Sequence, residues 1–296
     1  MGKGYLTISI DFELAWGVWD IVTREDLAFA ETAERPICAA LIELFDRYDV
    51  AVTWAMVAAI LDRSSSKSLP GREACWYAPD IVEGIVTAKV AHEIGSHSGR
   101  HVYFDQSSVA AAADDLEFAR DVHHRNGLSF RSFVYPRNGV GHLDLLPRFG
   151  IASYRGPDGG WVDAAGRLGS GVRRIVNLLD KALPVSPQPV HPMNNGTLTD
   201  VPGSTQILAR NGLRRFILPP VTQARLRRGL ERACQAGAVF HLWFHPSNFY
   251  FRTDEQIATL SDFLEHAAAE AARGRIEIRT MGSWASSDQA VAATVQ

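Results

Sequence analysis

Seven short, mostly apolar stretches recur along the chain, and most are rich in β-branched and aromatic residues. Runs of this length, bounded by glycine, proline or charged residues, are typical of buried strands. We therefore expect strands at about 5–10, 50–57, 93–98, 130–136, 150–155, 239–245 and 275–280.

Between these stretches, apolar residues recur every three or four positions, which is typical of amphipathic helices. One such segment covers 24–49, with Pro36 near a helix start or at a kink. Another covers 107–127, opens on a serine suited to capping and ends at Gly127. Thr253–Gln256 has the sequence of a capping box and predicts the start of a long helix. Further helices are expected at about 79–91, 142–149 and 222–237.

Strands that alternate with helices along a chain form mostly parallel sheets. With about seven such units, a closed or nearly closed sheet is favoured over an open one. The sequence therefore predicts an α/β fold, a distorted or incomplete (β/α) barrel of about seven mostly parallel strands, as a single domain over residues 1–296. In such barrels the functional side chains lie at the carboxyl ends of the strands.

Residues 156–218 interrupt this alternation. Glycines crowd the first part of the segment and prolines the second, without clear periodicity. A long irregular segment inside a regular chain is typical of a lid, a binding loop or an insertion.

Composition places the chain among ordinary globular proteins, with 46% hydrophobic and 21% charged residues. A net charge of −3 argues against a general nucleic-acid binder. The three cysteines are far apart and predict no disulfide framework. The first residues lead directly into a strand, and the apolar run is too short for a signal peptide, so we expect a cytoplasmic protein.

Two carboxylates end the first predicted strand. Asp11 and Glu13 are two positions apart, so they share one face of the strand, with Phe12 on the other. Two negative charges that close repel unless a cation or a proton lies between them. A solvated strand end is the alternative, and the other ligands of a cation must come from elsewhere in the chain.

Two histidines after the third predicted strand can supply these ligands. His97 and His101 are four positions apart, and if the chain turns helical there, they lie on one face about 6 Å apart. Two imidazoles and one carboxylate leave a coordination position for water, the arrangement of a catalytic divalent site. Zinc is the metal we expect, although cobalt and nickel accept the same ligands.

Other candidate residues lie at further strand ends. His245 ends the sixth predicted strand, where an imidazole suits proton donation near neutral pH. His241, about 13 Å away along the same strand, is expected in the core or in a wall of the barrel. Arg137 and Asn138 follow the fourth strand, and Arg137 could bind Asp11 by paired hydrogen bonds and keep the pKa of Asp11 low, with a salt bridge on the rim as the alternative.

Taken together, these stretches resemble the polysaccharide deacetylase family, also called carbohydrate esterase family 4. The His-Ser/Thr-x-x-His motif of the family is matched by His97, Ser98 and His101, and its Leu-x-x-His motif by Leu242 and His245. Two departures occur. The family places two adjacent aspartates where this chain has Asp11-Phe12-Glu13, and Pro136 precedes Arg137 instead of following it.

The resemblance implies a distorted barrel and metal-dependent hydrolysis of the amide of an acylated amino sugar. It implies one divalent ion on Glu13, His97 and His101, with Asp11 as the base, although Asp11 and Glu13 could exchange roles. His245 would protonate the leaving amine, and Arg137 would complete the catalytic group. The candidate substrate-binding residues are Trp16, Asn138 and Trp243.

The stretches "SIDFELAWG", "EIGSHS", "FVYPRN" and "HLWFHPSNF" look most like the cytoplasmic branch of the family that accompanies surface-polysaccharide biosynthesis. That implies a small-molecule or lipid-linked amino-sugar substrate. A catalytically silent sugar-binding module that keeps the ion is a second hypothesis. A hydrolase of another amide, a formamide or a cyclic ureide, is a third.

A group of arginines in the last third of the chain could meet the phosphates of a nucleotide- or lipid-linked sugar, with contact to a membrane surface. Their spacing favours the other interpretation, the solvated face of an amphipathic helix. The group comprises Arg210, Arg214, Arg215, Arg225, Arg227, Arg228 and Arg232.

Overall fold

The structure is a computed structural model that describes residues 2–66, 69–158 and 187–285. Seven of its strands correspond to the seven stretches expected from the sequence. They are β1 (Gly4–Phe12), β2 (Thr53–Met56), β3 (Glu93–Ser96), β4 (Ser132–Val134), β5 (Ser153–Arg155), β9 (Val239–Phe244) and β10 (Ile276–Ile278).

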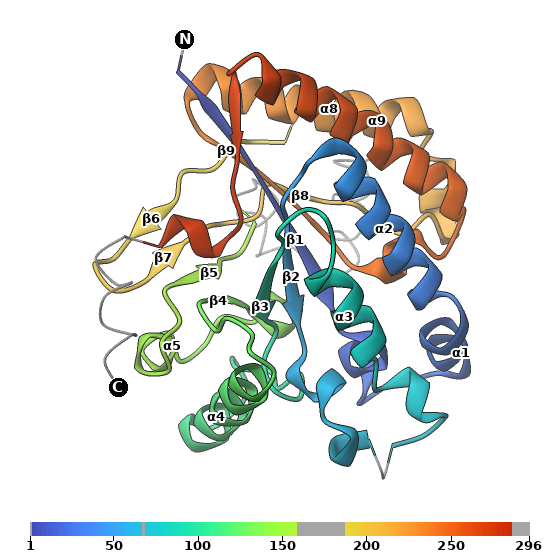
Figure 1. Cartoon of the computed structure of the whole chain (residues 1–296), viewed down its shortest axis with the longest axis vertical. Coiled ribbons are helices and arrows are strands. Elements are labelled where there is room, and N and C mark those ends of the chain that lie inside the picture. The colour runs from blue at the N-terminus through green and yellow to red at the C-terminus, as the bar shows by residue number, and fades with distance from the viewer. Residues whose placement is uncertain (1, 67–68, 159–186, 286–296) are drawn as a thin grey trace.

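The ten described strands form one sheet. Nine of them follow the order β6-β7-β5-β4-β3-β2-β1-β9-β8, and β10 pairs with β1 beside this series. Apart from the antiparallel pair β6 and β7, the strands pair in parallel. The sheet curls into an incomplete barrel with β1 near its centre (Figure 1). The α/β fold and the incomplete barrel expected from the sequence are confirmed. The three additional strands are each two residues long: β6 (Met193–Asn194), β7 (Thr199–Asp200) and β8 (Thr205–Gln206).

The helices lie on the outside of this sheet (Figure 1). α8 packs along α9, and α2 contacts α9 and α3. The described helices are α1 (Arg24–Thr32), α2 (Glu34–Tyr48), α3 (Pro79–Val86), α4 (Val109–Arg125), α5 (Leu145–Arg148), α8 (Pro219–Ala236) and α9 (Thr253–Ala272). Among the described helices, none is long and apolar enough to cross a membrane.

The two faces of β1 differ in polarity. One face belongs to the hydrophobic core, and the other lines the interior of the barrel. Leu6, Ile8, Ile10 and Phe12 are fully buried in the main hydrophobic core. Thr7, Ser9 and Asp11 alternate with them and are also buried. Because side chains on a strand alternate between faces, one face of β1 packs into the apolar core and the other turns polar groups into the barrel.

The expectation for Pro36 is confirmed. The segment 24–49 forms two helices that meet at Ala33, and Pro36 lies in the first turn of α2, where a proline costs no helical hydrogen bond. One expectation about a helix end is corrected. The capping box at Thr253–Gln256 does not form. Arg252 precedes α9 in a left-handed conformation (φ 56°), and the Thr253 hydroxyl donates to the Tyr250 carbonyl instead. The predicted cap of α4 is confirmed, since the Ser108 side chain accepts from the Ala111 amide.

The segment 156–218 is only partly within the described residues. Its described second part carries β6, β7 and β8, which pair with the sheet and are therefore part of the barrel wall. Residues 159–186 lie outside the described part of the chain, so the expected lid or insertion stays a prediction there.

Candidate active site

The candidate residues gather at the carboxyl edge of the sheet. Asp11 is the second-last residue of β1 and Glu13 directly follows the strand. His97 follows β3, and His245 follows β9. Because neighbouring parallel strands end at the same edge, three distant parts of the sequence converge there. The Glu13, His97 and His101 side chains offer ligand atoms that all lie within 4.8 Å of one another.

The position of Glu13 depends on a close approach by the backbone that follows it. The chain leaves β1 through a 3-10 helix, Leu14–Val18. A Cβ atom at Gly17 would lie 2.0 Å from Oε1 of Glu13. Only glycine leaves room here for the carboxylate.

His97 and His101 lie on a tight loop and not on the helical turn that the sequence suggested. Ser98 and His101 have left-handed backbones, with φ of 71° and 58°. The buried Asp115 of α4 holds the loop, because its carboxylate accepts from the amides of Gly99 (2.7 Å) and Arg100 (2.8 Å). Asp115 was missed by sequence reasoning, since its burial becomes visible only when α4 is docked.

The loop nevertheless brings the two imidazoles together. Their ring centroids are 5.2 Å apart. Nε2 of His97 and Nε2 of His101 each lie 3.2 Å from the same carboxylate oxygen, Oε2 of Glu13.

The hydrogen bonds of His97 show that this cluster suits a cation. Nδ1 of His97 lies 2.9 Å from the Val134 carbonyl oxygen, so it must be the donor. In the neutral ring, Nε2 then carries a lone pair that faces a carboxylate oxygen. Two acceptors in contact are unfavourable unless a proton or a metal ion lies between them. A carboxylate and two such nitrogens are a ligand set that zinc and similar divalent ions accept.

Asp11 is held by a buried arginine that sequence reasoning missed. Nη1 and Nη2 of Arg155 donate to Oδ1 and Oδ2 of Asp11 at 2.6 and 2.7 Å. Arg155 is only 1% exposed and ends β5. The expected contact between Arg137 and Asp11 is not formed. Arg137 instead pairs with Asp20 at 3.0 Å and lies over the ring of Tyr103.

The reason lies in the backbone after β4. Arg137 and Asn138 have left-handed backbones (φ 53° and 54°), and the Arg137 side chain reaches the rim of the site. The following strand, β5, places its last residue inside the barrel, where Arg155 reaches Asp11. A signal was present in the sequence, because "SYRG" ends the fifth predicted strand on an arginine.

A buried hydrogen-bond network orients Arg155 from behind. Nη1 of Arg155 also donates to Oγ of Ser9 (3.0 Å), and Nη2 donates to Oδ1 of Asn138 (3.1 Å). Ser9 lies 2.9 Å from Nε2 of His241, whose Nδ1 donates to the carbonyls of Val201 and Pro202. Since Nδ1 of His241 carries the proton, Ser9 donates to Nε2. His241 is therefore a wall residue that supports the site.

His245 faces both carboxylates. Its Nε2 lies 3.6 Å from Oδ2 of Asp11 and 3.6 Å from Oε1 of Glu13, and its side chain is 23% exposed. The backbone amide of His245 donates to the Asn248 side chain, which fixes the turn after β9. His245 therefore combines contact with the buried carboxylates and access to solvent.

The three candidate substrate-binding residues have different surroundings. Asn138 accepts from Arg155, and Trp243 lies under the Arg155 guanidinium at 4.3 Å while its Nε1 donates to Asp158. Trp16 is 4% exposed, and its Nε1 donates to the Trp76 carbonyl. Asn138 and Trp243 thus border the site through Arg155, whereas Trp16 is packed in the core.

Electrostatics keep both carboxylates ionised. Burial alone would raise the pKa of Asp11, but Arg155, His245 and His97 outweigh it, and the pKa is lowered. Burial likewise opposes ionisation of Glu13, and His245, His101 and His97 hold its pKa well below the usual range. Burial lowers the pKa of His241 to about 3, so this ring is neutral.

Comparisons with known proteins support the fold. No protein-family profile and no curated protein sequence matches the chain. A solved structure described as a polysaccharide deacetylase from Mycobacterium smegmatis is 15% identical, with a TM-score of 0.65 over 100% of this chain and 93% of that one. The PuuE allantoinase is 14% identical, with a TM-score of 0.60 over 93% of this chain and 87% of that one.

A third structure, described as a polysaccharide deacetylase from Pseudomonas aeruginosa PAO1, is 13% identical, with a TM-score of 0.59 over 93% of this chain and 87% of that one. At these identities the similarity establishes the fold alone. The chain has the fold of polysaccharide deacetylases.

Proposed function

We propose that this chain, which has the polysaccharide deacetylase fold, is a metal-dependent hydrolase that removes the N-acetyl group from an amino sugar. A carboxylate and two imidazoles face one another at the carboxyl edge of its sheet and support this function. The observation that carries this proposal is the shared contact of both histidine Nε2 atoms with one oxygen of Glu13.

Glu13, His97 and His101 would hold the ion, with zinc as the expected metal and cobalt or nickel as alternatives. A divalent ion in such a site polarises the amide carbonyl and lowers the pKa of water toward about 7. The different surroundings of the two carboxylates support their assignment. Oε2 of Glu13 faces both imidazoles, whereas both oxygens of Asp11 are bound by Arg155.

Asp11 would act as the general base. Its carboxylate is ionised and held by Arg155, so it can accept the proton of a water molecule that attacks the acetyl carbon. His245 would donate a proton to the amide nitrogen as the carbon–nitrogen bond breaks. Its exposed side chain, beside both carboxylates, suits a group that must meet the substrate. The products are acetate and a free amino sugar.

We further propose that the substrate is an intermediate of surface-polysaccharide biosynthesis and that the protein is cytoplasmic. Both statements rest on the resemblance of residues 9–17, 93–98, 133–138 and 241–249 to the cytoplasmic branch of the family. The carrier of such a sugar would be a nucleotide or a lipid.

The test is acetate release from a panel of N-acetylated amino sugars, by protein loaded with zinc and by protein treated with a chelator. We expect release only with the metal. General acid and base groups contribute about a hundred- to ten-thousand-fold each, so Asp11→Asn and His245→Ala should lower kcat by such factors. His124→Ala, which removes an exposed histidine of α4, is the matched control. Wild-type kcat in Asp11→Asn would contradict the proposal.

The similarity to an allantoinase supports a second candidate function, hydrolysis of a cyclic ureide. Opening a ring amide would need the same cation site, base and acid. Product identification separates the two functions, because ring opening leaves one larger product and no acetate. A silent sugar-binding module, the remaining alternative, would release no product from any substrate, with or without metal.

A further inference from the structure

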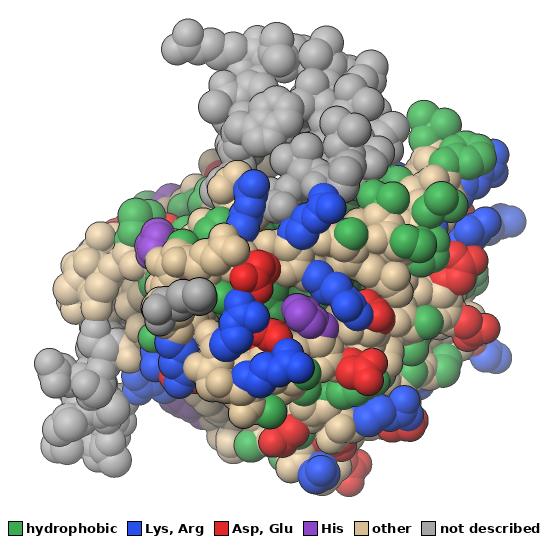
Figure 2. All heavy atoms as spheres, turned by 90° about the horizontal axis from the view of Figure 1, so that it is seen from above, with side chains coloured by type: hydrophobic (Ala, Val, Ile, Leu, Met, Phe, Trp, Pro, Cys, Tyr) green, Lys and Arg blue, Asp and Glu red, His purple; other side chains and the backbone are tan. Residues whose placement is uncertain are grey.

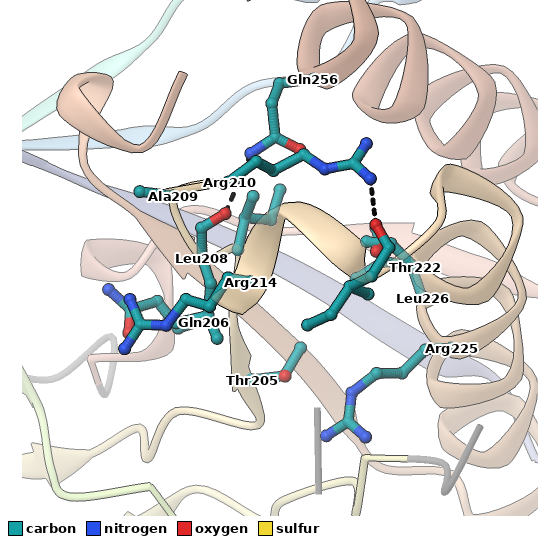
Figure 3. Close-up of a pocket in the computed structure, with 12 residues that line it drawn as sticks. Thr205, Gln206, Leu208, Ala209, Arg210, Arg214, Thr222, Arg225, Leu226 and Gln256 are labelled. Atoms are coloured by element: carbon teal, nitrogen blue, oxygen red, sulfur yellow. Dashed lines mark hydrogen bonds between the residues drawn. The ribbon is translucent and has the colours of Figure 1, made fainter. Parts of the chain in front are cut away.

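A recess lies beside β8, the strand next to β9, and the segment that follows the carboxyl end of β8 helps to form it. Its empty volume is about 470 Å³, which includes open solvent at the mouth. The segment after β8 and the first turns of α8 form its walls, and three arginines line it: Arg210, Arg214 and Arg225 (Figure 3). We call it the arginine pocket.

The described lining of the arginine pocket contains no acidic side chain. Arg210 and Arg225 are 6% and 5% exposed, and Figure 3 shows them on opposite sides of the pocket. Arg210 pairs with Glu255 at 2.9 Å outside the lining and donates to the Ile217 carbonyl. Arg214 is exposed at the mouth. Since guanidinium groups stay protonated in proteins, the lining carries three positive charges, and Glu255 balances that of Arg210.

The remaining arginines of this region have other surroundings. Arg227 pairs with Asp262 of α9 at 2.6 Å. Figure 2 shows Lys and Arg side chains interspersed with acidic ones on the face above α8 and α9. The solvated-face interpretation therefore suits Arg227, whereas Arg210, Arg214 and Arg225 line the pocket.

Two structural links join the arginine pocket to the candidate active site. Gln206 of the pocket pairs in register with Trp243 of β9, two residues before His245. Gln256 of the pocket donates to the Asn248 carbonyl, and the side chain of Asn248 accepts from the backbone amide of His245. The turn that positions His245 is thus joined by hydrogen bonds to Gln256, a residue that lines the arginine pocket.

We propose that the arginine pocket binds the phosphate group of a phosphate ester that carries the amino sugar, while the N-acetyl group lies beside His245. This inference rests on the proposed deacetylase function. Guanidinium groups bind phosphate oxygens by paired, charge-assisted hydrogen bonds. The other walls include Ile207, Leu208 and Leu226, which suit the apolar part of a carrier. A polyprenyl diphosphate combines phosphate with an apolar chain, and a nucleoside diphosphate combines it with a base whose faces are apolar.

Direct binding is tested with pyrophosphate as the probe, by titration calorimetry on the full chain. We expect binding that weakens with added salt. Arg214→Gln should raise Kd about tenfold or more, since a hydrogen bond to a charged group contributes about 1.5–3 kcal/mol. Arg215→Gln is the matched control, because Arg215 is exposed on the same turn, lies over Phe216 and does not line the pocket. It should bind as the wild type does.

Both variants change exposed residues, so they should melt at the wild-type temperature. No binding of pyrophosphate to the wild type would overturn the proposal. So would an equal rise of Kd in Arg214→Gln and Arg215→Gln, because that would indicate general charge attraction.

Kinetics then identify the carrier. Acetate release is compared for a free N-acetylated amino sugar, its nucleoside diphosphate ester and its polyprenyl diphosphate ester in micelles. The preferred ester should exceed the free sugar in kcat/KM, and Arg214→Gln should lower that ratio about tenfold. The ester with the higher ratio is the carrier. If Arg214→Gln still releases acetate and has the wild-type ratio of kcat/KM for the ester to kcat/KM for the free sugar, the pocket does not bind the phosphate group. No acetate from any substrate refutes the deacetylase function, and the pyrophosphate titration still decides the pocket.

Discussion

The pairing of Asp11 with Arg155 is the contact on which the proposed chemistry most depends. A bidentate ion pair fixes the direction of the carboxylate as well as its charge. Behind it, Ser9 and His241 hold the guanidinium through buried hydrogen bonds. Arg155 is thus a positioning residue, and its effect reaches the substrate through Asp11.

Arg155→Lys should lower kcat/KM about a hundredfold, because one ammonium group cannot bind both oxygens of Asp11 together with Ser9 and Asn138. Burial raises the pKa of Asp11 and Arg155 is the largest of the groups that lower it. The acid limb of the pH–rate profile should therefore move to higher pH. Steady-state kinetics between pH 5 and 9 measure both effects.

Arg148→Lys is the control for this substitution, since Arg148 is an exposed residue of α5 that pairs with Asp144, the residue before the helix. Arg137→Lys serves as the comparison. A greater loss in Arg137→Lys than in Arg155→Lys would show that the rim arginine, and not the buried one, acts on the base.

At the scale of the elements, β1 is the strand on which the rest of the fold is assembled. It pairs with β2, β9 and β10 and packs against α8. The contact with α8 is a close approach of two backbones at Gly4. A Cβ atom there would lie 2.7 Å from the backbone of Cys234. Backbone atoms cannot move aside as a flexible side chain can, so the register of α8 on β1 depends on this glycine.

Gly4→Ala should therefore destabilise the protein by about 1–3 kcal/mol, the usual cost of overpacking. Urea unfolding followed by circular dichroism measures the free energy of unfolding. Gly84→Ala in α3 is the matched control. A Cβ at Gly84 meets only Ile42, at 3.6 Å, and alanine is the better helix former by about 1 kcal/mol. Gly84→Ala should stabilise, and a neutral Gly4→Ala would contradict the close packing of β1 on α8.

At the scale of the whole molecule, the candidate metal ligands join parts of the sheet that do not touch directly. Glu13 follows β1 and His97 follows β3, and β2 lies between these strands. A ligand that binds only the folded chain stabilises it by mass action. An ion on this cluster should therefore hold the carboxyl edge of the sheet together.

Zinc at a hundred times its Kd should raise the free energy of unfolding by about 2.7 kcal/mol, and a chelator should reverse the change. The melting temperature in titrations with zinc measures it. Glu13→Gln should abolish most of the shift, because it removes the one charged ligand. Glu265→Gln, at an exposed position of α9, should keep it. An equal shift in Glu13→Gln would place the zinc elsewhere.

Acid should destabilise the molecule through buried neutral histidines. Burial lowers the pKa of His123 to about 4, while its Nδ1 donates to the Ser129 carbonyl. Between about pH 6.5 and 4 the unfolded chain therefore binds a proton at this position and the folded chain does not. Stability should fall as the pH falls through this window, by up to about 1.4 kcal/mol per pH unit for each such group.

Urea unfolding at pH 7, 6 and 5, with a chelator present to exclude effects of metal release, measures this slope. His123→Gln should have a shallower slope than the wild type. His124→Gln, at the adjacent exposed position, should not. Identical slopes in wild type and His123→Gln would mean that His123 is protonated in the folded protein.

The sequence by itself determined seven of the strands, their alternation with helices and the carboxyl edge as the place of the candidate site. These features follow from local periodicity and from the general geometry of parallel sheets, which hold whatever the partners are. The convergence of Asp11, Glu13, His97, His101 and His245 was predictable for the same reason. Two-residue strands such as β6, β7 and β8 are too short to show any period, so only their pairing with neighbours defines them.

Only the tertiary structure decided which arginine binds Asp11. Arg137 follows one predicted strand and Arg155 ends another, and their local sequences do not tell which side chain enters the barrel. The left-handed backbone at Arg137 directs it to Asp20, and the place of β5 in the sheet directs Arg155 inward. The same holds for the His97 loop, which Asp115 ties to α4, and for the arginine pocket. Contacts between residues far apart in sequence carry no local signal, because they depend on how the elements pack.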